Sequence, residues 1–327
     1  MSHEPLLVGV DAGGTSTRAL LTDASGRCLG YGTAGRGNPI SAGADLAADG
    51  VLAAVRAALA PSGAALADVS VIVPAMAGMR ASGGSGWLMD RLVAEGFAGT
   101  LRFESDLLAT YFSASASDSG YALVSGTGAC VIRVQQGRIV DAGDGLGWLL
   151  GDRGSGFWIG REIAQAAVQD LDGTGPATAL TDRVLTHCGV SPDAAVRDGR
   201  RHDLEELVGH LYATPPIALA GLAPYAFDED DAVARRILVA AGEHLADTLT
   251  AVLAGPGPVV IGGSVLGRSG ALREAFVARL GDALEGLELK SVDDGAIGAA
   301  VLAVRVAGGA ADEATLATLT RTVSAFR

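Results

Sequence analysis

The first residues that could do chemistry are Asp11, Gly13, Gly14, Thr15 and Thr17 in the stretch VGVDAGGTSTR, residues 8–18. Gly13 and Gly14 carry no side chain, so the backbone there can approach a ligand closely and direct several N–H groups at it. Apolar runs before and after the stretch predict two strands that meet at a tight turn. The turn therefore suits an electron-rich ligand that bears oxygen atoms.

A second stretch, YALVSGTGACVIRVQQGRIVDAG, residues 121–143, repeats this pattern. It contains an apolar strand, a Gly/Thr turn, a strand, a Gln-Gly turn and another strand, and we interpret it as a second copy of the opening unit. Two such turns, each at the end of its own sheet and facing across a cleft, could hold a polyphosphate from both sides.

The elements that must position these turns alternate in the first third of the chain. Strands are expected near residues 6–10, 18–23, 28–32, 69–75 and 100–104, with helices near 43–60 and 86–95. Residues 153–255 have a mostly helical pattern. The remainder predicts a strand in GPVVIGGSV, a helix from about 268, and helices in SVDDGAIGAAVLAV and from Asp312 to Ala325.

The 327 residues are enough for two domains. We place the boundary near residue 115, which gives a first domain over 1–115 and a second over 116–308 that includes a helical insertion. The terminal helix in 309–327 is expected to pack back on the first domain.

Composition excludes several classes of protein. With 49% hydrophobic and 19% charged residues the chain is globular, and its net charge of −13 argues against nucleic acid or an anionic membrane as a partner. No window reaches the roughly 18 uninterrupted apolar residues of a membrane-spanning helix. The first residues lack the pattern of a signal peptide, so a cytoplasmic location is expected.

The lysines and cysteines narrow the chemistry further. Lys290 is the only lysine and no glycine-rich loop precedes it, which excludes a P-loop and a protein-kinase site. The cysteines Cys28, Cys130 and Cys188 stand far apart, so neither a disulfide framework nor a local zinc site is indicated. The five histidines also lack metal-ligand spacing.

Five motifs occur in a fixed order: DAGGT, FESD, SGTG, GWLLGDRGS and VVIGGSV. Over about residues 6–308, this order resembles the N-acetylglucosamine kinase branch of the actin-like sugar kinases, within the wider group of BadF-type ATPases. The resemblance implies an α/β fold with two ribonuclease H-like domains facing across a cleft. It also implies ATP and Mg²⁺ as cofactors, an amino-sugar substrate and a homodimer.

The resemblance assigns nucleotide contacts to three glycine motifs. By this resemblance Asp11 orients hydrated Mg²⁺, in keeping with a hard ion that takes few carboxylates plus water and phosphate oxygens. The first two motifs would contact phosphates and the third would leave room for adenosine; their residues are Gly13, Gly14, Thr15 and Thr17, then Gly126, Thr127 and Gly128, then Gly262, Gly263 and Ser264. Each motif also suits a plain turn, with Thr15 and Thr17 as strand formers.

Transfer to a sugar hydroxyl needs a carboxylate that accepts the hydroxyl proton, and the resemblance gives this role to Asp106. Glu104 is a second choice, and Ser105 or Asp106 could instead cap the helix that follows. The implied sugar contacts, besides Asp106, are Asn38, Gly147, Trp148 and Asp152. Trp148 could otherwise be a core residue, and Asp152 could cap a helix that starts near Gly154.

One departure affects the substrate. Family members of the vertebrate type have Ser-Asn after the second Gly-Thr-Gly, where this chain has Ala129 and Cys130. We expect phosphorylation of the 6-hydroxyl of N-acetylglucosamine, with glucosamine as the alternative. An iron–sulfur activator of BadF type and a sugar-sensing regulator are less favoured, because the chain shows neither a suitable cysteine motif nor a DNA-binding segment.

Overall fold

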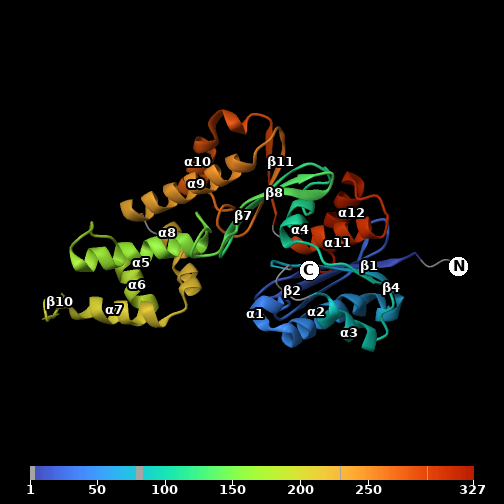
Figure 1. The fold of residues 1–327 in the computed structure, drawn as a ribbon, viewed down its shortest axis with the longest axis horizontal. Helices are drawn as coiled ribbons and strands as arrows, with labels where there is room; N and C mark the ends of the chain where they lie inside the picture. The colour runs from blue at the N-terminus through green and yellow to red at the C-terminus, as the bar shows by residue number, and fades with distance from the viewer. Residues whose placement is uncertain (1–3, 79–83, 229, 293) are drawn as a thin grey trace.

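The computed structural model describes residues 4–78, 84–228, 230–292 and 294–327. Its centre consists of two five-stranded sheets, and a helical arm extends from the second of them (Figure 1). The first sheet has the order β3-β2-β1-β4-β5. Its strands are β1 (Leu6–Ala12), β2 (Thr17–Thr22), β3 (Cys28–Ala34), β4 (Val69–Ala75) and β5 (Thr100–Leu101).

The second sheet repeats this topology. Its strands are β6 (Gly120–Ser125), β7 (Ala129–Gln135), β8 (Arg138–Asp144), β11 (Gly257–Gly262) and β12 (Leu287–Ser291). In both sheets, three consecutive strands form an antiparallel meander and two later strands add in parallel beside the first. The predicted duplication of the strand–turn–strand unit is therefore confirmed.

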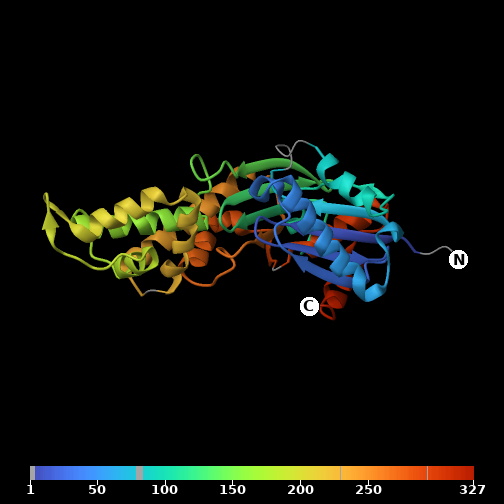
Figure 2. The ribbon, with the colours of Figure 1, turned by 90° about the horizontal axis from the view of Figure 1, so that it is seen from below.

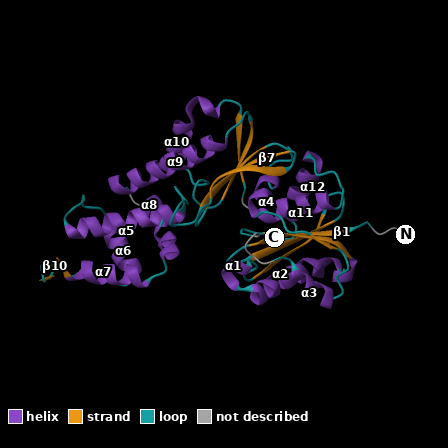
Figure 3. Cartoon of the chain, viewed as in Figure 1, coloured by secondary structure: helices purple, strands orange, loops and turns teal. Residues whose placement is uncertain are grey.

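Helices cover the first sheet on both faces (Figures 2 and 3). One face packs against α2 (Ala44–Leu59) and α3 (Gly86–Ala94), which follow the short helix α1 (Pro39–Ala42). The other face packs against α4 (Asp106–Phe112), α11 (Gly295–Val306) and α12 (Glu313–Val323). Burial on both faces explains why β1 reads as a nearly continuous apolar run.

Helix α11 packs very closely against its neighbours because glycines line the contacts. A Cβ on Gly298 would overlap the carbonyl of Ala109 in α4, and a Cβ on Gly9 of β1 would overlap the backbone of Ala300. At the chain end, Cys28 N donates to Thr322 Oγ1 of α12 at 2.9 Å. Helix α11 thus packs on the first sheet, although the expected division puts it within 116–308; that division stays a prediction.

The arm contains most of the remaining helices. They are α5 (Gly156–Asp172), α6 (Leu180–Cys188), α7 (His202–Ala213), α8 (Pro224–Asp228), α9 (Ala232–Val252) and α10 (Ala271–Leu280). Two features were not expected: strand β12, and the hairpin of β9 (Val196–Arg197) and β10 (Arg200–Arg201). The strand expected over 100–104 ends at Leu101, and Glu104 rejoins the sheet through one bridge to Ala75.

Candidate active site

The first glycine turn lies at the end of β1 and is held from outside. Gly13 N donates to Ser16 O at 3.0 Å, while Gly13 O accepts from the backbone N–H groups of Gly37 and Asn38 at 3.1 and 3.2 Å. Gly14 and Thr15 are exposed. The backbone of the turn is therefore fixed, with an open side on which a ligand can lie.

Asp11 stands directly before this turn among other charges. Burial raises the pKa of its carboxyl to about 6; Arg18, whose Nη1 lies 3.6 Å from Asp11 Oδ2, opposes the shift, and Asp294 and Asp106 add to it. Gly295 faces Asp11, and a Cβ there would come within 3.0 Å of Oδ2. A single approachable carboxylate in an acidic neighbourhood fits Mg²⁺, which takes one or two carboxylates and completes its shell with water and phosphate.

The second turn, between β6 and β7, is held by Asp152. Asp152 Oδ1 accepts from Ala129 N at 3.1 Å, and a Cβ on Gly128 would come within 2.9 Å of the same oxygen. Asp144 in turn accepts from the backbone of Asp152 and Arg153 at 2.6 and 2.9 Å. Asp152 is buried, and burial raises its pKa. The structure thus places this expected sugar ligand against the second glycine turn.

Helix α5 begins just after Asp152 but is capped by a different residue. The N-cap is Ser155, whose Oγ accepts from Trp158 N at 3.1 Å. The proposed capping role for Asp152 is therefore wrong. The carboxylate of Asp152 is used to shape the turn instead.

The third glycine motif meets the second turn at a pocket of about 110 Å³. Gly126, Thr127 and Ser264 line it, together with Phe227 and Arg268, whose guanidinium lies 4.8 Å from the Phe227 ring centre. Gly262 and Gly263 do not line this pocket. A Cβ on Gly263 would overlap Ser125 O and one on Gly262 would crowd Thr110, so both glycines allow the end of β11 to approach its neighbours.

Asp106 is the first residue of α4 but not its cap. Ser105 is the N-cap and accepts from Leu107 N at 3.2 Å, while Asp106 Oδ1 accepts from the same N–H at 2.9 Å. Burial raises the pKa of Asp106. Its charge also raises the pKa of Asp11 in the first half of the molecule and that of Cys130 in the second.

Cys130 marks the place where the two halves meet. Burial raises its pKa to about 11, and the carboxylates of Asp106, Asp144 and Asp152 add to the shift. The structure thus brings together Asp106 from α4, Asp144 from the end of β8 and Asp152 beside the second turn. Neutral Cys130 thus lies within the electrostatic influence of three acids.

The other expected sugar residues lie in different settings. Asn38 is buried and caps α1: its Oδ1 accepts from Ile40 N at 2.9 Å, and its Nδ2 donates to Ala77 O at 3.2 Å. Gly147 and Trp148 belong to an exposed loop, where Trp148 is 41% exposed and meets Phe157 edge-on. Trp148 is therefore not a core residue.

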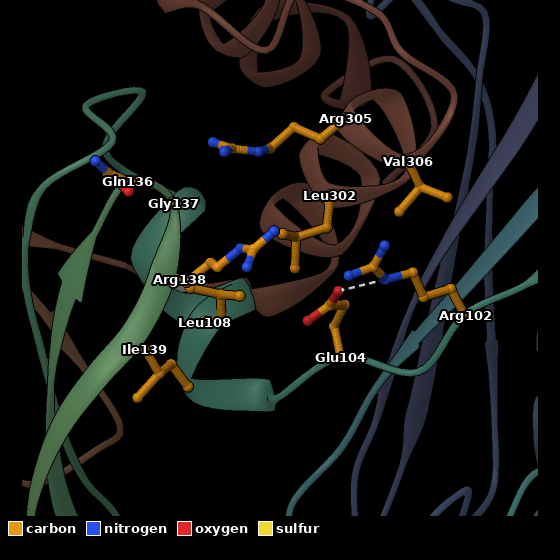
Figure 4. A pocket seen from close by; sticks show the side chains of 10 residues that line it. All are labelled: Arg102, Glu104, Leu108, Gln136, Gly137, Arg138, Ile139, Leu302, Arg305 and Val306. Carbon is orange, nitrogen blue, oxygen red and sulfur yellow. Dashed lines mark hydrogen bonds and ion pairs between the residues drawn. The ribbon is translucent and has the colours of Figure 1, made fainter.

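Two further candidates take structural positions. Thr17 is fully buried and its hydroxyl donates to Gly35 O at 2.7 Å, so it shapes the first turn and does not have the open position of a phosphate contact. Glu104 lines a separate pocket, where its carboxylate pairs with Arg102 at 2.9 Å (Figure 4).

Sequence reasoning missed Asp144 and Asp294. Each is an acid at a strand end or just before a helix, and its importance becomes visible only once the fold places it near Cys130 or Asp11. Asp144 ends the third strand of the second copy, whereas the third strand of the first copy ends at Ala34, so matching the two copies does not indicate Asp144.

Comparison with known proteins places this geometry among related chains. The glucosamine kinase GspK of Vibrio cholerae is 28% identical over 68% of this chain and 76% of its own length. The N-acetyl-D-glucosamine kinase of Dictyostelium discoideum is 26% identical over 93% of this chain and 99% of its own. A solved Chromobacterium violaceum structure, assigned as an N-acetylglucosamine kinase, superposes with a TM-score of 0.69 at 25% identity, covering 91% of this chain and 99% of its own.

Two more observations complete the comparison. In the described part of the chain, no helix is long and apolar enough to cross a membrane. The model of the BadF/BadG/BcrA/BcrD ATPase family matches residues 8–303, which include both glycine turns, Asp106 and the third glycine motif. The chain therefore belongs to the BadF/BadG/BcrA/BcrD ATPase family.

Proposed function

We propose that this protein is an ATP-dependent amino-sugar kinase that phosphorylates the 6-hydroxyl of N-acetylglucosamine. The observation that carries the proposal is the position of Asp106, whose charge acts on Asp11 beside the first glycine turn and on Cys130 beside the second. A carboxylate between two phosphate-binding turns is where a phosphoacceptor needs a base. The relatives named for amino-sugar kinase activity support the same function.

In the proposed reaction, the chain supplies positioning and a proton acceptor. Backbone N–H groups of the two turns hold the phosphates, and the pocket beside Thr127 and Ser264 receives the adenosine. The sugar 6-hydroxyl gives its proton to Asp106 while its oxygen bonds to the γ-phosphorus; the bond from that phosphorus to the bridging oxygen breaks and ADP leaves. Mg²⁺, held through water by Asp11, would neutralise charge on the phosphates.

A second substrate, glucosamine, is favoured by one specific observation. The carboxylates of Asp106, Asp144 and Asp152 all act electrostatically on Cys130, which has no strong hydrogen-bonding group to offer an acetamide. Three negative charges around a neutral thiol suit an ammonium group on carbon 2. N-Acetylglucosamine stays the first proposal, because it is the named substrate of a relative aligned over nearly the whole chain.

The test is coupled ADP release from Mg·ATP against a panel of sugars: N-acetylglucosamine, glucosamine, glucose, N-acetylmannosamine and no sugar. We expect an amino sugar to be preferred, and the 6-deoxy analogue of the preferred sugar to be inert because it lacks the acceptor oxygen. ADP release that is equal with and without sugar would reject the kinase function and favour an activator ATPase.

The assembly and location of the enzyme are also proposals. The family resemblance favours a homodimer working in the cytoplasm, where ATP is available. Light scattering of the purified chain tests the first point, and fractionation of cells tests the second. A monomer at working concentration would reject the dimer without affecting the kinase proposal.

A further inference from the structure

A second cavity lies between the two halves of the molecule, apart from both glycine turns. It has a volume of about 610 Å³, which is large enough for a phosphorylated sugar or a nucleotide. Three segments form it: the stretch from β5 into α4, the β7–β8 turn with the start of β8, and the end of α11 (Figure 4). The catalytic proposal does not use this cavity.

Its walls concentrate positive charge in an acidic protein. Arg102, Arg138 and Arg305 come from three different elements and line the cavity with a single carboxylate, that of Glu104 (Figure 4). The whole chain has only 24 basic residues and a net charge of −13. Guanidinium groups around one cavity repel one another, and an anion bound between them would relieve this repulsion.

Two of these three arginines keep their guanidinium N–H donors available for a ligand. Arg102 is paired with Glu104 at 2.9 Å. Within the described residues, Arg138 and Arg305 form no ion pair with a carboxylate. Guanidinium groups bind phosphate oxygens through paired N–H donors, so such a site favours phosphate over a simple halide.

The position of Arg305 is built by its surroundings. Its guanidinium lies 4.6 Å from the centre of the Phe112 ring, which restricts the side chain on one side. Gly137, at φ +66°, also adjoins the guanidinium, which a Cβ at this position would overlap. The glycine of the β7–β8 turn thus makes room for Arg305, and the cavity is preorganised.

On its β8 side the cavity is distant from Asp144, one of the acids that act on Cys130. Arg138 begins β8 and Asp144 ends it, so the strand separates them by about 20 Å. At the other side, Glu104 lies two residues before Asp106. A ligand in the cavity would therefore contact both halves of the molecule and the segment that leads to the proposed base.

We propose that this cavity binds a phosphate monoester, whose phosphate is held by Arg138 and Arg305 and whose body lies along the apolar walls from α4 and α11. Two sources share that chemistry, a sugar phosphate and a nucleotide monophosphate. The bound ester links the β7–β8 turn to α11, and so stabilises the contact between the halves.

The experiment measures binding without turnover. Purified nucleotide-free protein is titrated calorimetrically with N-acetylglucosamine 6-phosphate, AMP and inorganic phosphate in low salt. At least one ester is expected to lose about tenfold or more in affinity in Arg138→Gln, and less in Arg138→Lys, which keeps the charge but loses the fork. Arg197→Gln, an exposed arginine on β9, is the matched control and should bind as the wild type does.

Each outcome decides the proposal. Arg138-dependent binding of the sugar ester or of AMP supports the site and identifies the source of the phosphate. Equal affinity in wild type and Arg138→Gln would place all binding in the catalytic cleft and overturn the proposal, as would no binding of either ester. Because the measurement needs no catalysis, loss of ADP release in the sugar assay is a separate result.

Discussion

Helices α4 and α11 occupy equivalent places in the two halves of the molecule. Each follows the last strand in the sequence of its sheet, and the two pack against each other at Gly298 and Ala109. Each also starts after a capping side chain, Ser105 in α4 and Asp294 in α11. The first helical residue differs: it is Asp106 in one helix and Gly295 in the other.

Asp294 and Asp106 therefore have different roles: the first holds the fold together, and the second is the proposed catalytic base. The carboxylate of Asp294 accepts from Ala296 N and from Tyr31 OH, both at 2.9 Å, and pairs with Arg327. In the described part of the chain, Asp106 draws its hydrogen bonds from the start of its own helix. Asp294 is thus held by distant parts of the fold, whereas Asp106 is left available to a substrate.

The largest expected effect comes from Asp106→Asn. Removing the proton acceptor should lower kcat by about 10²- to 10⁴-fold, because general base catalysis contributes on that scale. Nucleotide affinity should be nearly unchanged, since the glycine turns and the pocket beside Ser264 stay intact. Steady-state ADP release and calorimetric titration with a non-hydrolysable ATP analogue measure the two quantities. Turnover near that of wild type would show that Asp106 is not the catalytic base.

The close crossing of the two helices is tested by Gly298→Ala. A Cβ at this position would overlap the carbonyl of Ala109, so α11 must shift, at a cost of about 1–3 kcal/mol or more in the free energy of unfolding. Gly209→Ala in α7 is the control, because open space surrounds that exposed helical glycine. It should gain about 0.5–1 kcal/mol. Urea unfolding measures the free energy of unfolding of both variants. Equal stabilities would contradict the close packing of α11 against α4.

Asp294→Ala should destabilise the fold while sparing most of the chemistry. Losing the cap of α11 and the acceptor for Tyr31 should cost about 1–2 kcal/mol. The kcat of the folded protein should fall much less than in Asp106→Asn. Thermal unfolding and ADP release on the same sample separate the effects, and a loss of turnover as large as that of Asp106→Asn would make Asp294 part of the chemistry.

The sequence predicted the parts of the fold that depend on local pattern. The two meanders, the glycine turns and helices α2, α3 and α12 were all visible from apolar periodicity and turn residues. Strand β12 was missed, because LELKS is short, mixed in polarity and half exposed at a sheet edge. Its pairing with β11 is a long-range interaction that the local sequence does not encode.

The candidate site was less predictable, because roles depend on which polar atoms the fold has already used. Thr17 and Asn38 have suitable side chains, but their polar atoms are hydrogen-bonded to backbone groups. Asp152 Oδ1 accepts from Ala129 N, and the expected contact of Asp152 with the sugar stays a prediction. The arginine cavity could not be predicted at all, since its arginines lie far apart in sequence and only the packing of the halves gathers them.

The smallest expected effect is on the pH dependence of the free energy of unfolding, which changes because Asp106 is a buried acid. Burial raises its folded pKa above the ordinary value of 3.8, so the native state binds more protons than the unfolded state between those two values. The stabilisation from the protonated form is present below pH 3.8 and is lost as the pH rises through the raised pKa. Asp106→Asn removes this dependence, and should therefore match wild type in acid and be more stable near neutral pH. Urea unfolding from acid to neutral pH measures the difference. A less stable variant at neutral pH would mean that the negative charge stabilises the start of α4 through the helix dipole, and that Asp106, like Asp294, serves the fold.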